Sequence, residues 1–328
     1  MQRLIGYGAY NLGFDKLLGK PMSGTGPIFF QYLRQNGWPI NHVKIICFRN
    51  ALLEGLPAAR AVTLYNGQKA INTAFLDNVD HLCDQARQFG FQVEVCIFHY
   101  HAIVNPAETP EHVPDLLDPA KLGDTNEAKV QAFFSLGNEA RVAEQVKLVR
   151  ALGDRLRRYD NVLFELGNEL RDPQGNDAAH CAMLGWMNRM RAELVTSLQG
   201  APARIGTSTG LLDQNEKLTF QPVRPVEGCS RPALKAEYFD FHFGQWSGGG
   251  NFAAGIAAAK QRAAGYHAGA PLLVNDDGAG AQRTPAHVES WARCAFTNGL
   301  SYTSKQPYPP GAAWDLDALG ALKRANGG

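Results

Sequence analysis

The sequence predicts a single-domain (β/α)8 barrel over residues 1–328. Eight short apolar runs follow one another along the chain, and amphipathic segments separate most of them, as expected for a parallel sheet with crossover helices. A length of 328 residues suits one such barrel, and no internal repeat or break in composition divides the chain. A doubly wound open sheet is the alternative, but no glycine-rich dinucleotide fingerprint follows an early run.

The expected strands are four to seven residues long and rich in β-branched and aromatic side chains. In chain order they cover residues 4–7, 42–48, 92–98, 161–166, 204–208, 238–243, 271–275 and 299–303.

Four helices are expected between these strands. The clearest covers residues 139–159, where apolar side chains recur at helical spacing with Arg and Lys opposite. Another covers residues 285–298 and begins after Thr284 with Pro285, a capping residue followed by a proline favoured in the first turn. The other two helices cover residues 78–89 and 252–266.

Three segments read as long loops at the carboxyl ends of strands. They cover about residues 103–125, 244–251 and 305–315, and they are rich in Pro, Gly or charged side chains. Because active sites of (β/α)8 barrels lie at this end of the strands, we expect these loops to border the site.

The composition is that of a globular protein, with 45% hydrophobic and 19% charged residues. The formal net charge of +1 gives no electrostatic reason to bind nucleic acid or an anionic membrane surface. No run of about 18 apolar residues occurs, so no membrane span is expected. The first residues lack the features of a signal peptide, and the compartment stays open between cytoplasmic and secreted with the leader removed.

The six cysteines are scattered and form no CxxC pair, so a zinc ribbon is not expected. Cys47 and Cys96 lie inside apolar runs and are best read as buried thiols. The even number of cysteines does not by itself predict disulfides.

The most informative segment is 152–169, which leads from a helix into the expected strand 161–166 and ends in Asn168 and Glu169. A carboxyl group at the carboxyl end of a barrel strand points into the mouth of the barrel. Partial burial there raises a carboxyl pKa, as a general acid requires. Asn168 would offer an amide to a substrate hydroxyl. A Glu that merely caps the next turn is the alternative.

This segment resembles the fourth strand of the clan A glycoside hydrolases, the cellulase-like (β/α)8 retaining glycosidases. Their pattern is a helix, Tyr or Phe, Asn-Val, an apolar strand with a Glu, and then Asn-Glu. The resemblance implies that Glu169 is the acid/base and that Asn168 contacts the substrate. It is strong at this strand and loose elsewhere, although the strand order agrees over most of the chain.

The resemblance also implies a nucleophile at the end of the seventh strand, where the family usually has Glu. This chain has Asp276, followed by Asp277 and Gly278. An Asp is shorter by one C–C bond, about 1.5 Å. Retaining enzymes hold the two carboxyl groups about 5–5.5 Å apart and inverting enzymes about 6.5–9.5 Å. An inward shift of the strand end would keep the retaining distance, and otherwise the separation would be near 7 Å. An Asx turn is the non-catalytic interpretation.

Further site residues are expected on the sixth strand and in the loops at the mouth. His242, in the sixth strand, matches a family position whose side chain contacts the nucleophile. Trp246 and Trp314 are expected in loops at the mouth, where aromatic faces stack on sugar rings. Tyr308 falls in the same group, whereas Trp186 and Trp291 lie in helical patterns and are expected to be structural.

The second and third strands contribute basic and imidazole side chains. Lys44 stands where many members of the family have Arg, and Arg49 lies near the strand end, so either could support the nucleophile. His99 and His101 are two residues apart and share a face if the strand continues. In the family, a His at this place often lines the sugar subsite.

The sequence therefore predicts a hydrolase that cleaves β-linked oligo- or polysaccharides without a cofactor or metal. One alternative is a metal-dependent barrel hydrolase in which His99, His101 and a carboxylate hold zinc. Another is a carbohydrate-binding barrel without catalytic activity, because the Glu usual in the seventh strand is missing.

Overall fold

The computed structural model describes residues 3–8, 28–49, 62–170, 177–202, 204–208, 236–243, 252–266, 269–276, 284–305 and 312–327.

Eight parallel strands form a closed barrel in chain order, with β1 pairing with both β2 and β8. The predicted (β/α)8 fold is confirmed. The boundaries of β6 agree with the prediction, and those of the other strands differ from it by one or two residues at an end. The strands are β1 (Ile5–Gly8), β2 (His42–Ile46), β3 (Gln92–His99), β4 (Val162–Asn168), β5 (Arg204–Thr207), β6 (Tyr238–Phe243), β7 (Leu272–Asp276) and β8 (Ser301–Lys305).

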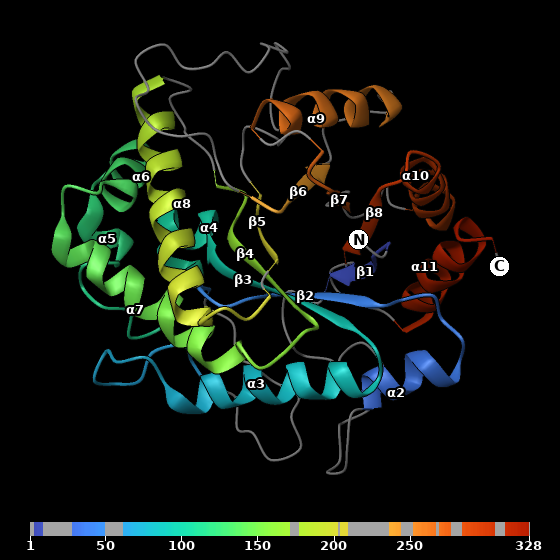
Figure 1. Ribbon diagram of the computed structural model, residues 1–328, viewed down its shortest axis with the longest axis horizontal. Helices are drawn as coiled ribbons and strands as arrows, with labels where there is room; N and C mark the ends of the chain where they lie inside the picture. The colour runs from blue at the N-terminus through green and yellow to red at the C-terminus, as the bar shows by residue number, and fades with distance from the viewer. Residues whose placement is uncertain are drawn as a thin grey trace.

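Helices surround the barrel, with α2 and α3, α7 and α8, and α9 to α11 at different positions around it (Figure 1). The larger helices are α2 (Ile28–Gln35), α3 (Thr73–Gln88), α6 (Asn126–Phe134), α7 (Glu139–Leu156), α8 (Asp177–Leu198), α9 (Phe252–Tyr266), α10 (Pro285–Thr297) and α11 (Ala312–Ala325). All four predicted helices are present, as α3, α7, α9 and α10. Helices α2, α6 and α11 were not predicted, and for α8 only the helical pattern around Trp186 was recognised.

The local signals in the sequence have the expected structural roles. Thr284 Oγ1 accepts a hydrogen bond from the backbone N–H of His287 and caps α10, and Pro285 is its first residue. The apolar stripe of α7 is buried against the barrel. Its members are Val142, Val146, Val149, Leu152 and Leu156.

The segment over about residues 103–125, which was predicted as a long loop, includes short helical turns. The segment contains the end of α4 (Tyr100–Val104), a 3-10 turn η1 (Pro106–Glu108) and α5 (Pro119–Leu122). The side chains of Asn105 and Asp118 cap η1 and α5, and each cap is followed by a proline. The Pro, Asn and Asp residues that suggested a loop therefore begin short helices.

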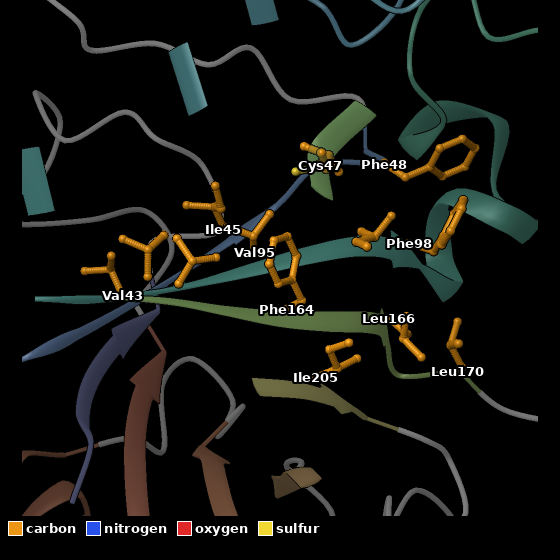
Figure 2. Close-up of a cluster of buried hydrophobic side chains, with 14 of the residues drawn as sticks. Val43, Ile45, Cys47, Phe48, Val95, Phe98, Phe164, Leu166, Leu170 and Ile205 are labelled. Carbon is orange, nitrogen blue, oxygen red and sulfur yellow. The ribbon is translucent and has the colours of Figure 1, made fainter. Parts of the chain in front are cut away.

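The barrel strands alternate between two environments. On β2, Val43 and Ile45 face the surrounding helices, whereas Lys44 faces the barrel interior. Figure 2 shows Val43, Ile45, Val95, Phe164, Leu166 and Ile205, which project from neighbouring strands into the layer between sheet and helices. A small separate cluster of Leu4, Leu163, Tyr238 and Leu273 is also buried. Polar side chains occupy part of the barrel interior, which is described with the site.

The cysteines in the described part of the structure differ in state. Cys47 and Cys96 are buried free thiols, as predicted. Cys181 in α8 is disulfide-bonded, and its partner lies outside the described residues. Within the described ranges, no helix has the length and apolar character required to cross a bilayer.

Candidate active site

The ends of β3 and β4 bring the strongest sequence candidates together. His99 is the last residue of β3, Asn168 is the last residue of β4, and the two are partners in the strand register. Because all strands are parallel, these residues lie at the carboxyl end of the barrel. Glu169 follows directly, so the predicted Asn-Glu pair is at the barrel mouth.

Glu169 has a strained backbone and a mostly buried side chain. Its φ of 55° is in the left-handed region, which is unfavourable for a residue with a side chain. Its backbone N–H donates to Ser208 Oγ at 3.3 Å. Its carboxylate Oε2 lies 3.0 Å from His101 Nε2, and 12% of the side chain is exposed. The turn therefore directs a partly desolvated carboxylate toward a histidine.

The turn around Glu169 also depends on a glycine. Leu170 folds back so closely over Gly167 that a Cβ there would lie 2.3 Å from Leu170 Cδ1. Leu170 is completely buried. Only glycine permits this approach without displacement, and so Gly167 helps to set the position of the residue two places later.

His99 and His101 come together, although not for the predicted reason. The strand ends at His99 and α4 begins at Tyr100, so the condition for a shared strand face, that the strand continues to His101, is not met. The chain passes from strand to helix at His99, the N-cap residue of α4. The rings of His99 and His101 nevertheless lie close together, with centroids 5.2 Å apart. His99 is buried and contacts Asn168, whereas His101 is 39% exposed and contacts Glu169.

Glu108, which was not predicted as a site residue, adds a carboxylate to this side of the mouth. Glu108, the last residue of η1, lies 3.7 Å from His99 Nε2 and 3.3 Å from Arg49 Nη2. Arg49 therefore pairs with Glu108. The close contact with His99 lowers the pKa of Glu108 despite its partial burial. Burial lowers the pKa of His99, so its ring is neutral near pH 7.

The remaining predicted site residues are placed only in part. Asp276 is the last residue of β7 and is in register with Phe243 and Ser304 of the neighbouring strands. His242 lies on β6 opposite Asn275. The side chains of Asp276 and His242 are outside the described part of the structure.

The aromatic candidates at the mouth have different outcomes. Trp314 lies within α11, so its prediction as a loop residue was wrong. The alanines next to it favour a helix directly after the Pro-Pro-Gly stretch that suggested a loop. Trp246, Tyr308, Asp277 and the loop 244–251 fall outside the described residues. Trp186 is buried and donates to Gln145, which agrees with a structural role.

A buried ionic layer occupies the barrel interior and was not predicted. Lys44 Nζ lies 2.8 Å from Glu165 Oε2 and also contacts Asp240 Oδ2. Glu94 lies 3.3 Å from His42 Nε2 and accepts a hydrogen bond from Tyr238 Oη at 2.8 Å.

The charges in this layer are strongly coupled. Burial lowers the pKa of Lys44, but Asp240, Glu165 and Glu94 raise it by more, so the ammonium stays charged. Burial raises the pKa of Glu165 to about 8 despite the attraction of Lys44. The signal in the sequence was the recurrence of charged residues inside strands that are otherwise apolar. Lys44 is therefore enclosed among interior carboxylates instead of lying at the strand end.

The same layer contains a possible metal-ligand group. Glu94, Glu165 and Asp240 are the group of three potential ligands that converges within the described ranges. Lys44 already places a cation against two of these carboxylates. His99 and His101 belong to no such group among the described residues. Among the described side chains, which do not include Asp276, the two histidines therefore have no third metal ligand beside them.

The fold and the mouth together define a closed parallel (β/α)8 barrel whose fourth strand ends at Asn168 and is followed directly by Glu169. No protein-family model and no curated protein sequence matches this chain. Solved structures do match, and they include glycoside hydrolases of family 5.

An endo-1,4-β-D-mannanase from Thermotoga petrophila is 13% identical with a TM-score of 0.63, and the match covers 99% of each chain. A broad-specificity endoglucanase from an uncultured bacterium is 11% identical with a TM-score of 0.60, covering 99% of this chain and 94% of the other. A β-1,4-mannanase from the sea hare Aplysia kurodai is 13% identical with a TM-score of 0.54, covering 98% and 92%. The predicted resemblance to cellulase-like barrels is thus confirmed for the fold.

Proposed function

We propose that this protein is a glycoside hydrolase that cleaves β-linked glycans with two carboxylates, Glu169 and Asp276. The observation that carries the proposal is the strained, mostly buried Glu169 directly after β4, paired with His101. Strained residues cluster at active sites, where the surrounding structure holds them in place. The fold shared with mannanases and endoglucanases supports the same reaction class.

In this proposal Glu169 protonates the leaving oxygen and later activates water. His101 is close enough to hydrogen-bond its carboxyl group. Asn168 positions a substrate hydroxyl next to the acid. Asn168 contacts His99, which in turn contacts Glu108 and, through it, Arg49.

Asp276 would attack the anomeric carbon, or act as the base if the enzyme inverts. The end of β7 supports this assignment because its backbone reaches the same mouth as Asn168. Retention with an inward shift of the strand end is our first choice. His242 would position the nucleophile, and Trp246 and Trp314 would contact sugar rings.

The test is sugar release from a panel of β-linked polysaccharides and aryl β-glycosides. Wild type should cleave at least one substrate, and Glu169→Gln should lose activity on the natural substrate. Glu111→Gln is the matched control, because Glu111 is an exposed carboxylate in the segment between η1 and α5, after β3. Binding without cleavage by wild type would favour a non-catalytic sugar-binding barrel. If wild type neither binds nor cleaves any glycan of the panel, both the glycosidase proposal and the sugar-binding alternative are contradicted.

A further inference from the structure

A continuous line of polar contacts leads from the outer rim of the mouth to Asn168. Arg49 Nη2 lies 3.3 Å from Glu108 Oε2, and the same Oε2 lies 3.7 Å from His99 Nε2. On its other side, His99 Nδ1 lies 3.0 Å from Asn168 Nδ2. Three residues, Arg49, Glu108 and His99, therefore form a line of contacts that ends at Asn168, the residue before Glu169.

The contact between His99 and Asn168 determines where the ring carries its proton. The Asn168 Nδ2 group can only donate a hydrogen bond, so His99 Nδ1 must accept it. A neutral imidazole carries one proton, which is then on Nε2. That Nε2–H faces the carboxylate of Glu108. The 3.7 Å separation is longer than a hydrogen bond, so the contact is electrostatic.

The same contact orients the amide of Asn168. With Nδ2 directed at His99, the opposite atom, Oδ1, is buried and has no hydrogen-bond partner among the described residues. A buried amide oxygen without a partner is costly, and a bound ligand that donates a hydrogen bond would remove that cost. A hydroxyl group of a glycan is such a donor.

We propose that Glu108 is a positioning residue that holds the proton of His99 on Nε2 and so keeps the Asn168 Oδ1 free to accept a substrate hydroxyl. The substrate part of this inference rests on the proposed glycosidase function, whereas the proton position does not. If the proton moved to Nδ1, the amide would have to turn over. Asn168 would then present donors to the substrate instead of an acceptor.

The groups around His99 act on its charge in opposite directions. Glu108 and Glu169 raise its pKa, whereas burial, Arg49 and His101 lower it. The pKa of Glu108 is itself lowered by the contact with His99 and, to a lesser degree, by Arg49. Removing the charge of Glu108 alone should therefore lower the pKa of His99 further.

The experiment is long-range 1H–15N NMR of the histidine side chains over a pH titration of the intact protein. His99 in wild type should show a protonated Nε2 and an unprotonated Nδ1. Asn168→Asp, whose carboxylate only accepts, should move a proton onto Nδ1. Glu108→Gln should lower the His99 pKa, and the exposed control Glu111→Gln should leave it as in wild type.

An Nδ1–H ring in wild type would overturn the inference, as would a His99 pKa that is the same in Glu108→Gln and wild type. These readouts need no substrate, so they separate this inference from the proposed function. With a cleavable glycan in hand, Glu108→Gln should lower kcat/KM by about three- to tenfold, the loss expected for one misdirected hydrogen bond. An unchanged kcat/KM would overturn the positioning role.

Discussion

The ammonium group of Lys44 lies 2.8 Å from the carboxylate Oε2 of Glu165, and neither side chain is exposed to solvent. Lys44 is on β2 and Glu165 is on β4, so the contact joins two strands that are separated by β3. Asp240 adds a contact from β6 to the same ammonium. One buried cation thus ties the strand that leads into Glu169 to two others.

Lys44→Met should strongly destabilise the protein because it leaves buried carboxylates without their counter-ion. Breaking a buried pair of this kind costs about 3–5 kcal/mol in the free energy of unfolding. The measurement is chemical denaturation, with Lys147→Met as the control, because Lys147 pairs with Glu144 on an exposed face. Equal stability of the two variants would contradict a structural role for the buried ammonium.

Glu165→Gln should change stability in a manner that depends on pH. Burial raises the pKa of Glu165 to about 8 in the folded protein, above its ordinary value of 4.5. Between these values the folded state holds a proton that the unfolded state has released, so this group makes the protein less stable as pH rises. Gln cannot titrate, so this pH dependence is lost in the variant. The stability of Glu165→Gln relative to wild type should therefore increase from pH 5 to pH 8.

The check is a series of denaturation curves over that pH window. Glu111→Gln serves as the control. Because Glu111 is exposed, the difference in the free energy of unfolding between this variant and wild type should not change with pH. If the difference in the free energy of unfolding between Glu165→Gln and wild type is also independent of pH, Glu165 is ionised in the folded protein throughout this pH range.

Much of the fold could be predicted because parallel barrel strands are short apolar runs with clear limits. Each strand was found for that reason, and so were helices with a regular stripe, such as α7. Around Trp186 a helical pattern was recognised, but the limits of α8 were not predicted, because Met and Trp fill its stripe in place of Val and Leu. Its buried members are Met183, Trp186, Met187, Met190 and Leu194.

The candidate site could be predicted only where it follows directly from a strand end. Asn168 and Glu169 were found in this way. Glu108 was not, because its contact with His99 depends on how the segment after β3 folds back through α4 and η1. The left-handed backbone of Glu169 also has no signal in the sequence, since glycine or asparagine would be the usual residue there.

That backbone gives a prediction about stability and function at one position. At a φ of 55°, glycine is unstrained whereas alanine is not. Glu169→Gly should therefore be about 1 kcal/mol more stable than Glu169→Ala, while both lack activity. Both variants remove the carboxylate, so the difference in stability between them measures the cost of the left-handed backbone conformation alone.

The same Gly and Ala pair at Glu111, which lacks a positive φ, provides the comparison. There glycine should be no more stable than alanine. Thermal or chemical unfolding of all four variants measures both differences. A Glu169→Gly variant that is less stable than Glu169→Ala would show that the left-handed conformation costs nothing at this position.

The end of β7 provides the sharpest test of the reaction itself. If Asp276 is the second carboxylate, Asp276→Asn should lower kcat by several orders of magnitude, because no group remains to attack the anomeric carbon or activate water. Asp277→Asn is the matched control and should keep most of the activity. The reverse result would assign the role to Asp277. NMR of the first product anomer formed by wild type then decides the stereochemistry: retention would indicate carboxyl groups about 5–5.5 Å apart, and inversion a separation of about 6.5–9.5 Å, as an unshifted Asp would give.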